Sequence, residues 1–190
     1  MNAVTRIIDY YFRHVRGCFT MPDVRILKEA FCRSADLLAY NISTKEQFHI
    51  ENAVTHSQLW PFSPDNLHDL FDKSFLRHPG KRVGKYYFKE ILKTYRGLGF
   101  SPSKVKRIFV IWCIKPGVDV KAVSDSYYKK RRIRVEVMSF RDRILSDLQE
   151  KVAGSVSHDD EALRILSLVA QREIQTKKEA RSQTALNTES

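Results

Sequence analysis

The sequence has few cysteines, and their spacing excludes the sites that cysteines usually build. Only three occur among the 190 residues, at Cys18, Cys32 and Cys113. An odd and widely spaced set excludes a paired disulfide framework, and no C-x-x-C occurs to indicate a zinc site. Each cysteine lies in an apolar run, which is typical of a small buried residue. We therefore expect a reducing, cytoplasmic setting, at the nucleoid if the protein is prokaryotic.

Long apolar runs and glycine-rich loops are also missing. No apolar run approaches the roughly 18 residues that a membrane span requires, and charges interrupt the apolar positions of the N-terminal segment, which excludes a signal peptide. No glycine-rich loop follows any expected strand, which argues against a Rossmann-like nucleotide binder. We therefore predict a soluble protein without a membrane partner.

Acidic residues are scarce relative to basic ones. Asp and Glu number 22 against 33 Lys and Arg, which gives a formal net charge of +11. An excess of this size favours a polyanionic partner, nucleic acid in the first place and an anionic membrane surface in the second. The apolar fraction of 43% and the chain length are ordinary for one well-packed domain.

The order of expected elements predicts an α/β protein. Apolar residues at helical spacing mark a helix over 3–15, which Gly17 ends, with Asp9 on its solvent side. The later elements are, in order, a strand over 18–31 interrupted at Pro22, a hairpin over 34–56, helices over 67–75 and 82–95, a strand over 106–115, a helix over 120–131, a strand over 133–140, and helices over 141–152 and from 157 onward. The alternation that ends this order predicts parallel strands joined by a right-handed crossover.

One core domain and a C-terminal extension follow from this order. We expect the core over 1–152, a C-terminal helix over 153–175, and a disordered tail over 176–190, where apolar residues nearly vanish. The expected fold class is therefore α/β, with a mixed central sheet flanked by helices and a C-terminal helical extension.

The hairpin over 34–56 brings two acids together. If its loop at 41–46 is symmetric, Asp36 lies directly across the ladder from Glu51. Opposed Cβ atoms in an antiparallel pair lie roughly 4.5–5.5 Å apart, and like charges that close are destabilising unless, for example, a cation is shared. Side-chain alternation places Asp36, His49 and Glu51 on one face. The alternative is a hairpin whose acids simply face solvent.

This element order resembles that of the PD-(D/E)XK nuclease superfamily, which includes many restriction endonucleases, Mrr-type enzymes and Holliday-junction resolvases. Two acids support the resemblance: Asp36 ends a Ser-Ala-Asp run, and Glu51 lies in the next strand. The resemblance covers residues 2–152. It implies a restriction-endonuclease-like fold with DNA as the partner, RNA being the weaker alternative. It also implies a homodimer or a partner subunit.

The resemblance further implies phosphodiester hydrolysis that depends on Mg²⁺, with Mn²⁺ as the other candidate cofactor. Asp36, Glu51 and the backbone carbonyl of Asn52 would hold the metal, which prefers oxygen ligands and retains several waters. Asp36 and Glu51 would be catalytic in this role. His49 is a third catalytic candidate because it is expected to share the face of the acids, although a lone strand histidine is more often a hydrogen-bonded residue.

One position departs from the motif of the family. The family has a lysine two residues after the second acid, where this sequence has Ala53. That lysine would orient or activate the attacking water and stabilise negative charge, and alanine can do neither. Three explanations stay open. The role has moved to Lys28, Lys45 or His49, or the chain is a non-catalytic subunit that binds nucleic acid or a protein, or Ala53 is an engineered change.

Basic residues form two clusters that predict contacts with nucleic-acid phosphates. Within 77–107, ten Lys and Arg stand against Glu90 alone, whereas a merely solvated surface usually mixes both signs. The second cluster ends the expected helix over 120–131, where part of it complements the helix dipole. The predicted nucleic-acid-binding residues are Lys81, Arg82, Lys85, Lys89, Lys93, Lys129, Lys130, Arg131 and Arg132.

Overall fold

The computed structural model of this chain describes residues 2–26, 34–54, 64–76, 84–114, 117–153 and 164. The chain divides into two compact units, Met1–Ile144 and Leu145–Ser190. The central sheet and the candidate site both belong to the first unit. The tail predicted over 176–190, and all but one residue of the helix predicted from 157, lie outside the described residues.

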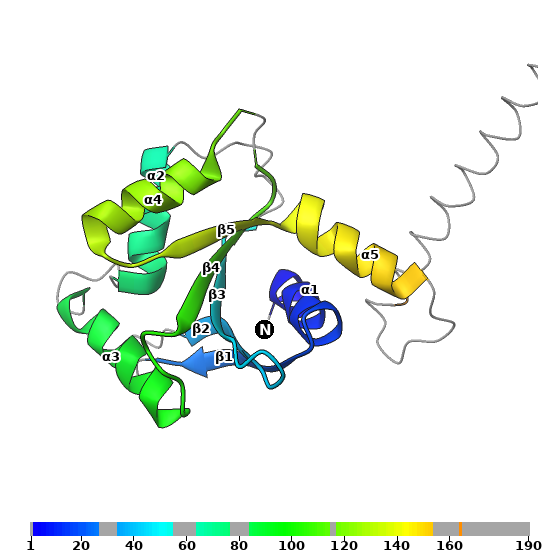
Figure 1. Cartoon of the computed structure of the whole chain (residues 1–190), viewed down its shortest axis with the longest axis horizontal. Helices are drawn as coiled ribbons and strands as arrows, with labels where there is room; N and C mark the ends of the chain where they lie inside the picture. Colours follow the sequence, from blue (N-terminus) through cyan, green and yellow to red (C-terminus); the bar gives the residue numbers. More distant parts are fainter. Residues whose placement is uncertain are drawn as a thin grey trace, which may run out of the picture. The chain divides into compact units, whose positions relative to one another are not determined.

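Five strands form one mixed sheet in the first unit (Figure 1). They are β1 (Cys18–Arg25), β2 (Ser34–Asn41), β3 (Gln47–Asn52), β4 (Val105–Ile111) and β5 (Val135–Ser139). Their order in the sheet is β1-β2-β3-β4-β5. The first three pair antiparallel, and β4 pairs parallel with both β3 and β5. The predicted α/β class, with an antiparallel meander followed by a parallel crossover, is confirmed.

Helices cover both faces of this sheet. The helices of the first unit are α1 (Ala3–Tyr10), α2 (Pro64–Phe71), α3 (Gly84–Gly97) and α4 (Val120–Arg131), with π-helical turns η1 (Tyr11–Val15), η2 (Asp72–Leu76) and η3 (Phe140–Leu145). The helix α5 (Ser146–Ala153) belongs to the second unit. Figure 1 shows α1 on one face and α2, α3 and α4 on the other. The side chain of Asn2 caps α1 by accepting the N–H of Thr5, 2.8 Å away. Gly17, at φ +62°, ends this helical segment as predicted.

Aromatic packing fills the face covered by α2, α3 and α4. The ring centroid of Phe71 lies 5.4 Å from that of Phe109 and 5.1 Å from that of Tyr127. This aromatic cluster joins α2, β4 and α4. A second cluster joins α3 to the antiparallel strands, with Tyr95 and Leu38 both about 1% exposed. The two clusters anchor all three helices to one side of the sheet.

The face of the sheet covered by α1 contains a buried acid, Asp9, that was predicted from the sequence to face solvent. Phe12 packs edge-on against Phe48 of β3, with ring centroids 5.4 Å apart. Asp9 is buried beside it, only 2% exposed, with Oδ2 3.1 Å from Arg13 Nη2. Its Oδ1 has no hydrogen-bond partner among the described residues. The prediction that Asp9 faces solvent is wrong, because the face that α1 buries is wider than its apolar stripe.

Strand β1 is an edge of the sheet and contains Pro22. The strand continues through this proline, which is tolerated because β1 pairs with β2 on one side only. The next residue, Asp23, has a left-handed backbone at φ +51°. Ladder pairs with β2 stop at Pro22–Leu37 and resume at Val24–Ala35. The residue opposite Asp23 in this register is Asp36, so the break lies beside the predicted site.

Candidate metal and nucleic-acid site

Strands β2 and β3 part where the two predicted acids lie. Their ladder ends at the pair Leu37–Ile50, and Asp36 and Glu51 come next in the same register. Beyond that pair, side chains replace the ladder bonds. The backbone nitrogen of Asp36 lies 3.4 Å from Glu51 Oε1, and that of Asn52 lies 2.9 Å from Asp36 Oδ2. The structure therefore brings together the three residues that the sequence analysis assigns to a metal.

The two carboxylates have different further partners. Asp36 Oδ2 also accepts from the side-chain Nδ2 of Asn52, 2.7 Å away. The same amide donates to Thr5 Oγ1 of α1 at 3.1 Å. Glu51 Oε1 instead lies 2.8 Å from His49 Nε2, on the α3 side of the sheet. His49 and Glu51 share a face as predicted. The Asp36 carboxylate instead accepts hydrogen bonds from Asn52, whose side chain also contacts α1. The backbone N–H of Asn52 is available to Asp36 because the β2–β3 ladder has ended there.

His49 links Glu51 to α3 through a buried hydrogen bond. Its Nδ1 lies 2.6 Å from the hydroxyl oxygen of Tyr95, and His49, Tyr95 and Glu51 are 0%, 1% and 4% exposed. Burial raises the pKa of Tyr95 well above the ordinary tyrosine range, and the charge of Arg107 on β4 acts in the opposite direction. The sequence gives no sign that Tyr95 contacts His49, because 46 residues separate the two. Arg107 was predicted only as a member of the basic cluster over 77–107.

Asp36 and Glu51 supply oxygen ligands of the kind that Mg²⁺ prefers. Magnesium is usually held by one or two carboxylates, with waters completing its shell. Within the described part of the chain, no group of three or more His, Cys, Asp and Glu side chains is arranged to hold a metal. Asp36 and Glu51 therefore remain predicted ligands of a hydrated Mg²⁺ or Mn²⁺.

The position of the missing lysine is apolar in the structure. Ala53 packs against the aromatic cluster that joins α2, β4 and α4. Lys45 lies in the loop between β2 and β3, at the other end of the hairpin from Asp36. Both ring nitrogens of His49 are hydrogen-bonded within the protein. Lys28 lies outside the described residues, and none of the other candidates provides an unbonded cation or base beside the acids.

The outer face of α3 presents part of the predicted basic stripe. Lys89 and Lys93 are exposed, and Lys93 Nζ lies 3.8 Å from Glu90 Oε2. The inner face is formed by buried residues, among them Ile91 and Tyr95, that anchor the helix to the sheet. Other predicted members, Lys81 and Arg82 together with the side chain of Lys85, lie outside what the structure describes.

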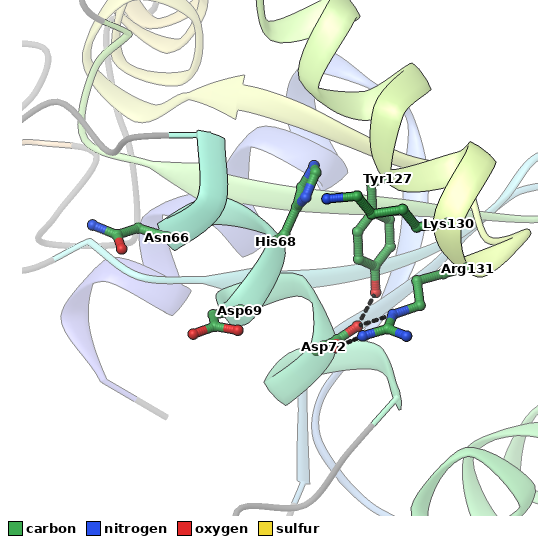
Figure 2. A pocket seen from close by; sticks show the side chains of 7 residues that line it. All are labelled: Asn66, His68, Asp69, Asp72, Tyr127, Lys130 and Arg131. Atoms are coloured by element: carbon green, nitrogen blue, oxygen red, sulfur yellow. Dashed lines mark hydrogen bonds and ion pairs between the residues drawn. The ribbon is translucent and has the colours of Figure 1, made fainter.

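The basic cluster at the end of α4 is partly engaged within the protein. Arg131 donates two hydrogen bonds to Asp72 of η2, at 3.0 Å from Nε and 2.6 Å from Nη2 (Figure 2). These bonds raise the pKa of Arg131. The hydroxyl of Tyr127 donates to the same carboxylate at 3.0 Å. The three side chains line a pocket of about 260 Å³ between α2 and α4, shared with Asn66, His68, Asp69 and Lys130.

The residues of the basic cluster at the end of α4 therefore differ in role. Arg131 joins α4 to η2, and its side chain is 38% exposed. Lys129, Lys130 and Arg132 are exposed and remain candidates for phosphate contacts. The sequence could not separate them, because the partner of Arg131 is 59 residues away.

The described basic residues of α3 and α4 lie on the same face of the sheet (Figure 1). Because β3, β4 and β5 are parallel, their carboxyl ends, including Glu51, lie at one end of the sheet. The helices α3 and α4 each lead to the amino end of the next strand, β4 and β5. Lys93, in the second half of α3, and Lys129 and Lys130, at the end of α4, therefore both lie toward those amino ends.

A function for this chain is therefore inferred from the geometry of the acids and of the basic helices, because comparisons with known proteins do not suggest one. Protein-family models, curated proteins and solved structures give no match for this chain. No helix among the described residues is long and apolar enough to cross a membrane.

Proposed function

We propose that this chain is a DNA-binding protein with a restriction-endonuclease-like core, in which Asp36 and Glu51 hold Mg²⁺ or Mn²⁺ against a phosphate group. The supporting observation is the 3.4 Å contact between the Asp36 nitrogen and Glu51 Oε1, at the point where the β2–β3 ladder ends. Like charges at directly opposed strand positions are destabilising, although the Asp36 carboxylate is bonded to Asn52 and that of Glu51 to His49. A divalent cation held by the two acids would offset this repulsion and could bind a phosphate oxygen.

Binding is favoured over hydrolysis at this site. A bound divalent cation would supply polarisation of the phosphate and a water of lowered pKa. Ala53 adds no charge that could stabilise the reaction, since its side chain packs against the aromatic cluster. Both ring nitrogens of His49 are committed to Tyr95 and Glu51, which leaves neither to activate a water. The chain would then suit a non-catalytic subunit of a DNA-processing assembly.

Endonuclease activity is the second candidate, and the acid pair itself favours it. Electrostatic binding of phosphates needs only basic side chains. A pair of carboxylates at the carboxyl edge of a sheet is a costly feature for a protein that binds DNA through charge alone. A pair of carboxylate ligands is what a metal-dependent hydrolase requires.

Replacing Asp36 by asparagine tests the cation site. We expect the wild-type protein to bind Mn²⁺ in calorimetry, and Asp36→Asn to weaken that binding by about tenfold or more, because one of two charged ligands becomes neutral. DNA affinity in Mg²⁺ should fall with it, and DNA affinity in EDTA should not change. Asp69→Asn, at an exposed acid of α2, is the matched control. Equal Mn²⁺ affinity in the wild type and Asp36→Asn would remove the proposed site.

Incubation of duplex, branched and single-stranded DNA with Mg²⁺ or Mn²⁺ separates the two candidates. The binding role predicts intact DNA. Nicked or cut product made by the wild type and absent with Asp36→Asn would establish the endonuclease instead. Ala53→Lys is informative in the same assay, because cleavage gained by that variant would identify the missing lysine as the reason for inactivity.

Reversing the charge of Lys89 and Lys93 together tests the phosphate-binding surface. We expect DNA affinity to fall by about tenfold or more, and the slope of log K against log salt to decrease by about 2, because two phosphate contacts are lost. The comparison variant reverses Lys129 and Lys130 of α4, the other candidate phosphate contacts. Fluorescence anisotropy over a salt series measures both. Unchanged DNA affinity in the variant of Lys89 and Lys93 would contradict the placement of DNA along α3.

A further inference from the structure

We propose that an exposed apolar surface at one corner of the sheet stacks the unpaired bases of single-stranded DNA. This apolar corner consists of Phe19 on β1, Tyr40 on β2, Ile42 in the loop after β2, and Leu98 directly after α3. The inference rests on the proposed DNA binding and adds the form of DNA that the α3 side of the sheet accepts. It makes no use of the predicted cation site.

Exposed apolar side chains are concentrated at this corner. Among the described residues, four large apolar side chains are exposed: Phe19 (68%), Ile42 (49%), Leu98 (40%) and Tyr128 (37%). Three of the four belong to the apolar corner, and Tyr128 lies on α4. Single exposed apolar residues are ordinary, whereas a group of them in one place marks a binding surface. The corner therefore calls for an occupant.

Strand pairing and one ring contact bring the corner together. Phe19 is the ladder partner of Tyr40, so their side chains project from the same face of the sheet. Tyr40 packs against the cluster that joins α3 to the antiparallel strands, and its ring centroid lies 6.2 Å from that of Phe100. Ile42 follows Tyr40 by two residues, and Leu98 precedes Phe100 by two. The three exposed side chains thus adjoin one anchored pair of rings.

The aromatic ring of Phe19 stands on a fixed backbone. Phe19 lies in the paired part of β1, before the ladder is interrupted at Asp23. A ring held by a paired strand loses little freedom when another flat group stacks on it. Every nucleobase has a π face that can stack in this way, but in a duplex the neighbouring base pairs cover those faces. Such a ring therefore favours unpaired bases over paired ones.

The exposed charges beside the corner are basic. Lys45 lies in the loop after β2 and Arg96 in the last turn of α3, and both are exposed. Glu46, the acid of that loop, is ion-paired with Lys106. An apolar surface bordered by cations fits single-stranded DNA, whose phosphates are anionic and whose unpaired bases can be buried. A second copy of this chain fits poorly, because its net charge is also positive, at +11.

The apolar corner continues the basic face of α3. Lys89, Lys93 and Arg96 are exposed, and their spacing of four and three residues places them along one side of the helix. The helix ends at Gly97, and the corner begins at the next residue, Leu98. A DNA strand whose phosphates contact this side of α3 therefore reaches the corner where the helix ends.

Affinity for a single-stranded thymidine oligonucleotide and for a duplex of the same length, both measured by fluorescence anisotropy in EDTA, tests this inference. We expect Phe19→Leu to weaken single-strand binding by about fivefold or more and to leave duplex binding unchanged, because the ring on which a base stacks is lost. Phe19→Trp keeps a ring and should retain the wild-type affinity for both forms. Tyr128→Leu, at the exposed aromatic residue of α4, is the matched control and should alter neither affinity.

The opposite results are equally specific. Equal single-strand affinity in the wild type and Phe19→Leu overturns the stacking surface, as does an equal loss in Phe19→Leu and Tyr128→Leu. Binding to phosphatidylglycerol vesicles that Phe19→Leu abolishes, with single-strand affinity unchanged, assigns the corner to a membrane surface instead. Duplex binding that needs Lys89 and Lys93, with no effect of Phe19→Leu on either form, keeps the proposed function and removes the corner. A wild type that binds neither form of DNA removes both.

Discussion

Truncation of Phe109 to alanine is expected to lower the free energy of unfolding by about 4 kcal/mol, the range for a large aromatic residue in a core. Phe109 is 1% exposed on β4, the strand that lies between β3 and β5. Its ring centroid lies 5.4 Å from that of Phe71 and 6.5 Å from that of Phe75. Because β4 is paired on both sides, the backbone cannot move to close the cavity, and the lost contacts are not replaced.

Urea denaturation followed by circular dichroism measures this loss. Phe19→Ala is the matched control, because Phe19 is 68% exposed on the edge strand β1. That variant should change the free energy of unfolding by less than about 0.5 kcal/mol. Similar losses for the two phenylalanines would mean that the aromatic cluster is not the core of the fold.

Replacing Asp72 by alanine is expected to lower the free energy of unfolding by about 3 kcal/mol. Asp72 is 6% exposed and accepts bonds from Tyr127 and Arg131. Its loss leaves the buried Tyr127 hydroxyl without its acceptor and Arg131 without its counter-charge. Breaking a buried ion pair costs about 3–5 kcal/mol, and the low end applies because the partly exposed guanidinium can be hydrated.

Asp69→Ala separates the ion pair from a general effect of removing an acid. Asp69 lines the same pocket, is exposed, and should change stability by no more than about 0.5 kcal/mol. A double-mutant cycle of Asp72→Ala with Arg131→Ala should give a coupling energy of about 1–3 kcal/mol. Additive effects in that cycle would show that the two side chains do not stabilise each other.

The sequence predicted the parts of the fold that depend on local periodicity. The helix predicted over 120–131 has those bounds in α4, and the apolar run at 106–115 contains most of the buried strand β4. The hairpin register was accessible because a symmetric loop determines it, so Asp36 and Glu51 could be matched before the fold was known. These features need only side-chain alternation and turn geometry.

Interactions between distant residues could not be predicted in this way. Burial of Asp9 follows from how α1 lies on the sheet, and the sequence shows only that it is outside the apolar stripe. Tyr95 reaches His49 and Arg131 reaches Asp72 only after α3 and α4 have packed. In the helix pattern, Tyr95 is one more apolar position, although in the fold its hydroxyl is hydrogen-bonded to the buried ring of His49.

Pro22, together with the left-handed backbone of Asp23, affects whether another chain can pair with the edge strand β1. A free strand edge is a template on which another chain can add a strand, the first step of fibre growth. Pro22 offers no N–H to such a strand, and the positive φ of Asp23 turns the next peptide out of the ladder direction. An incoming strand would find its hydrogen bonds interrupted at mid-length. β1 is thereby protected against edge-to-edge aggregation, and a second copy of this chain would have to associate through another surface.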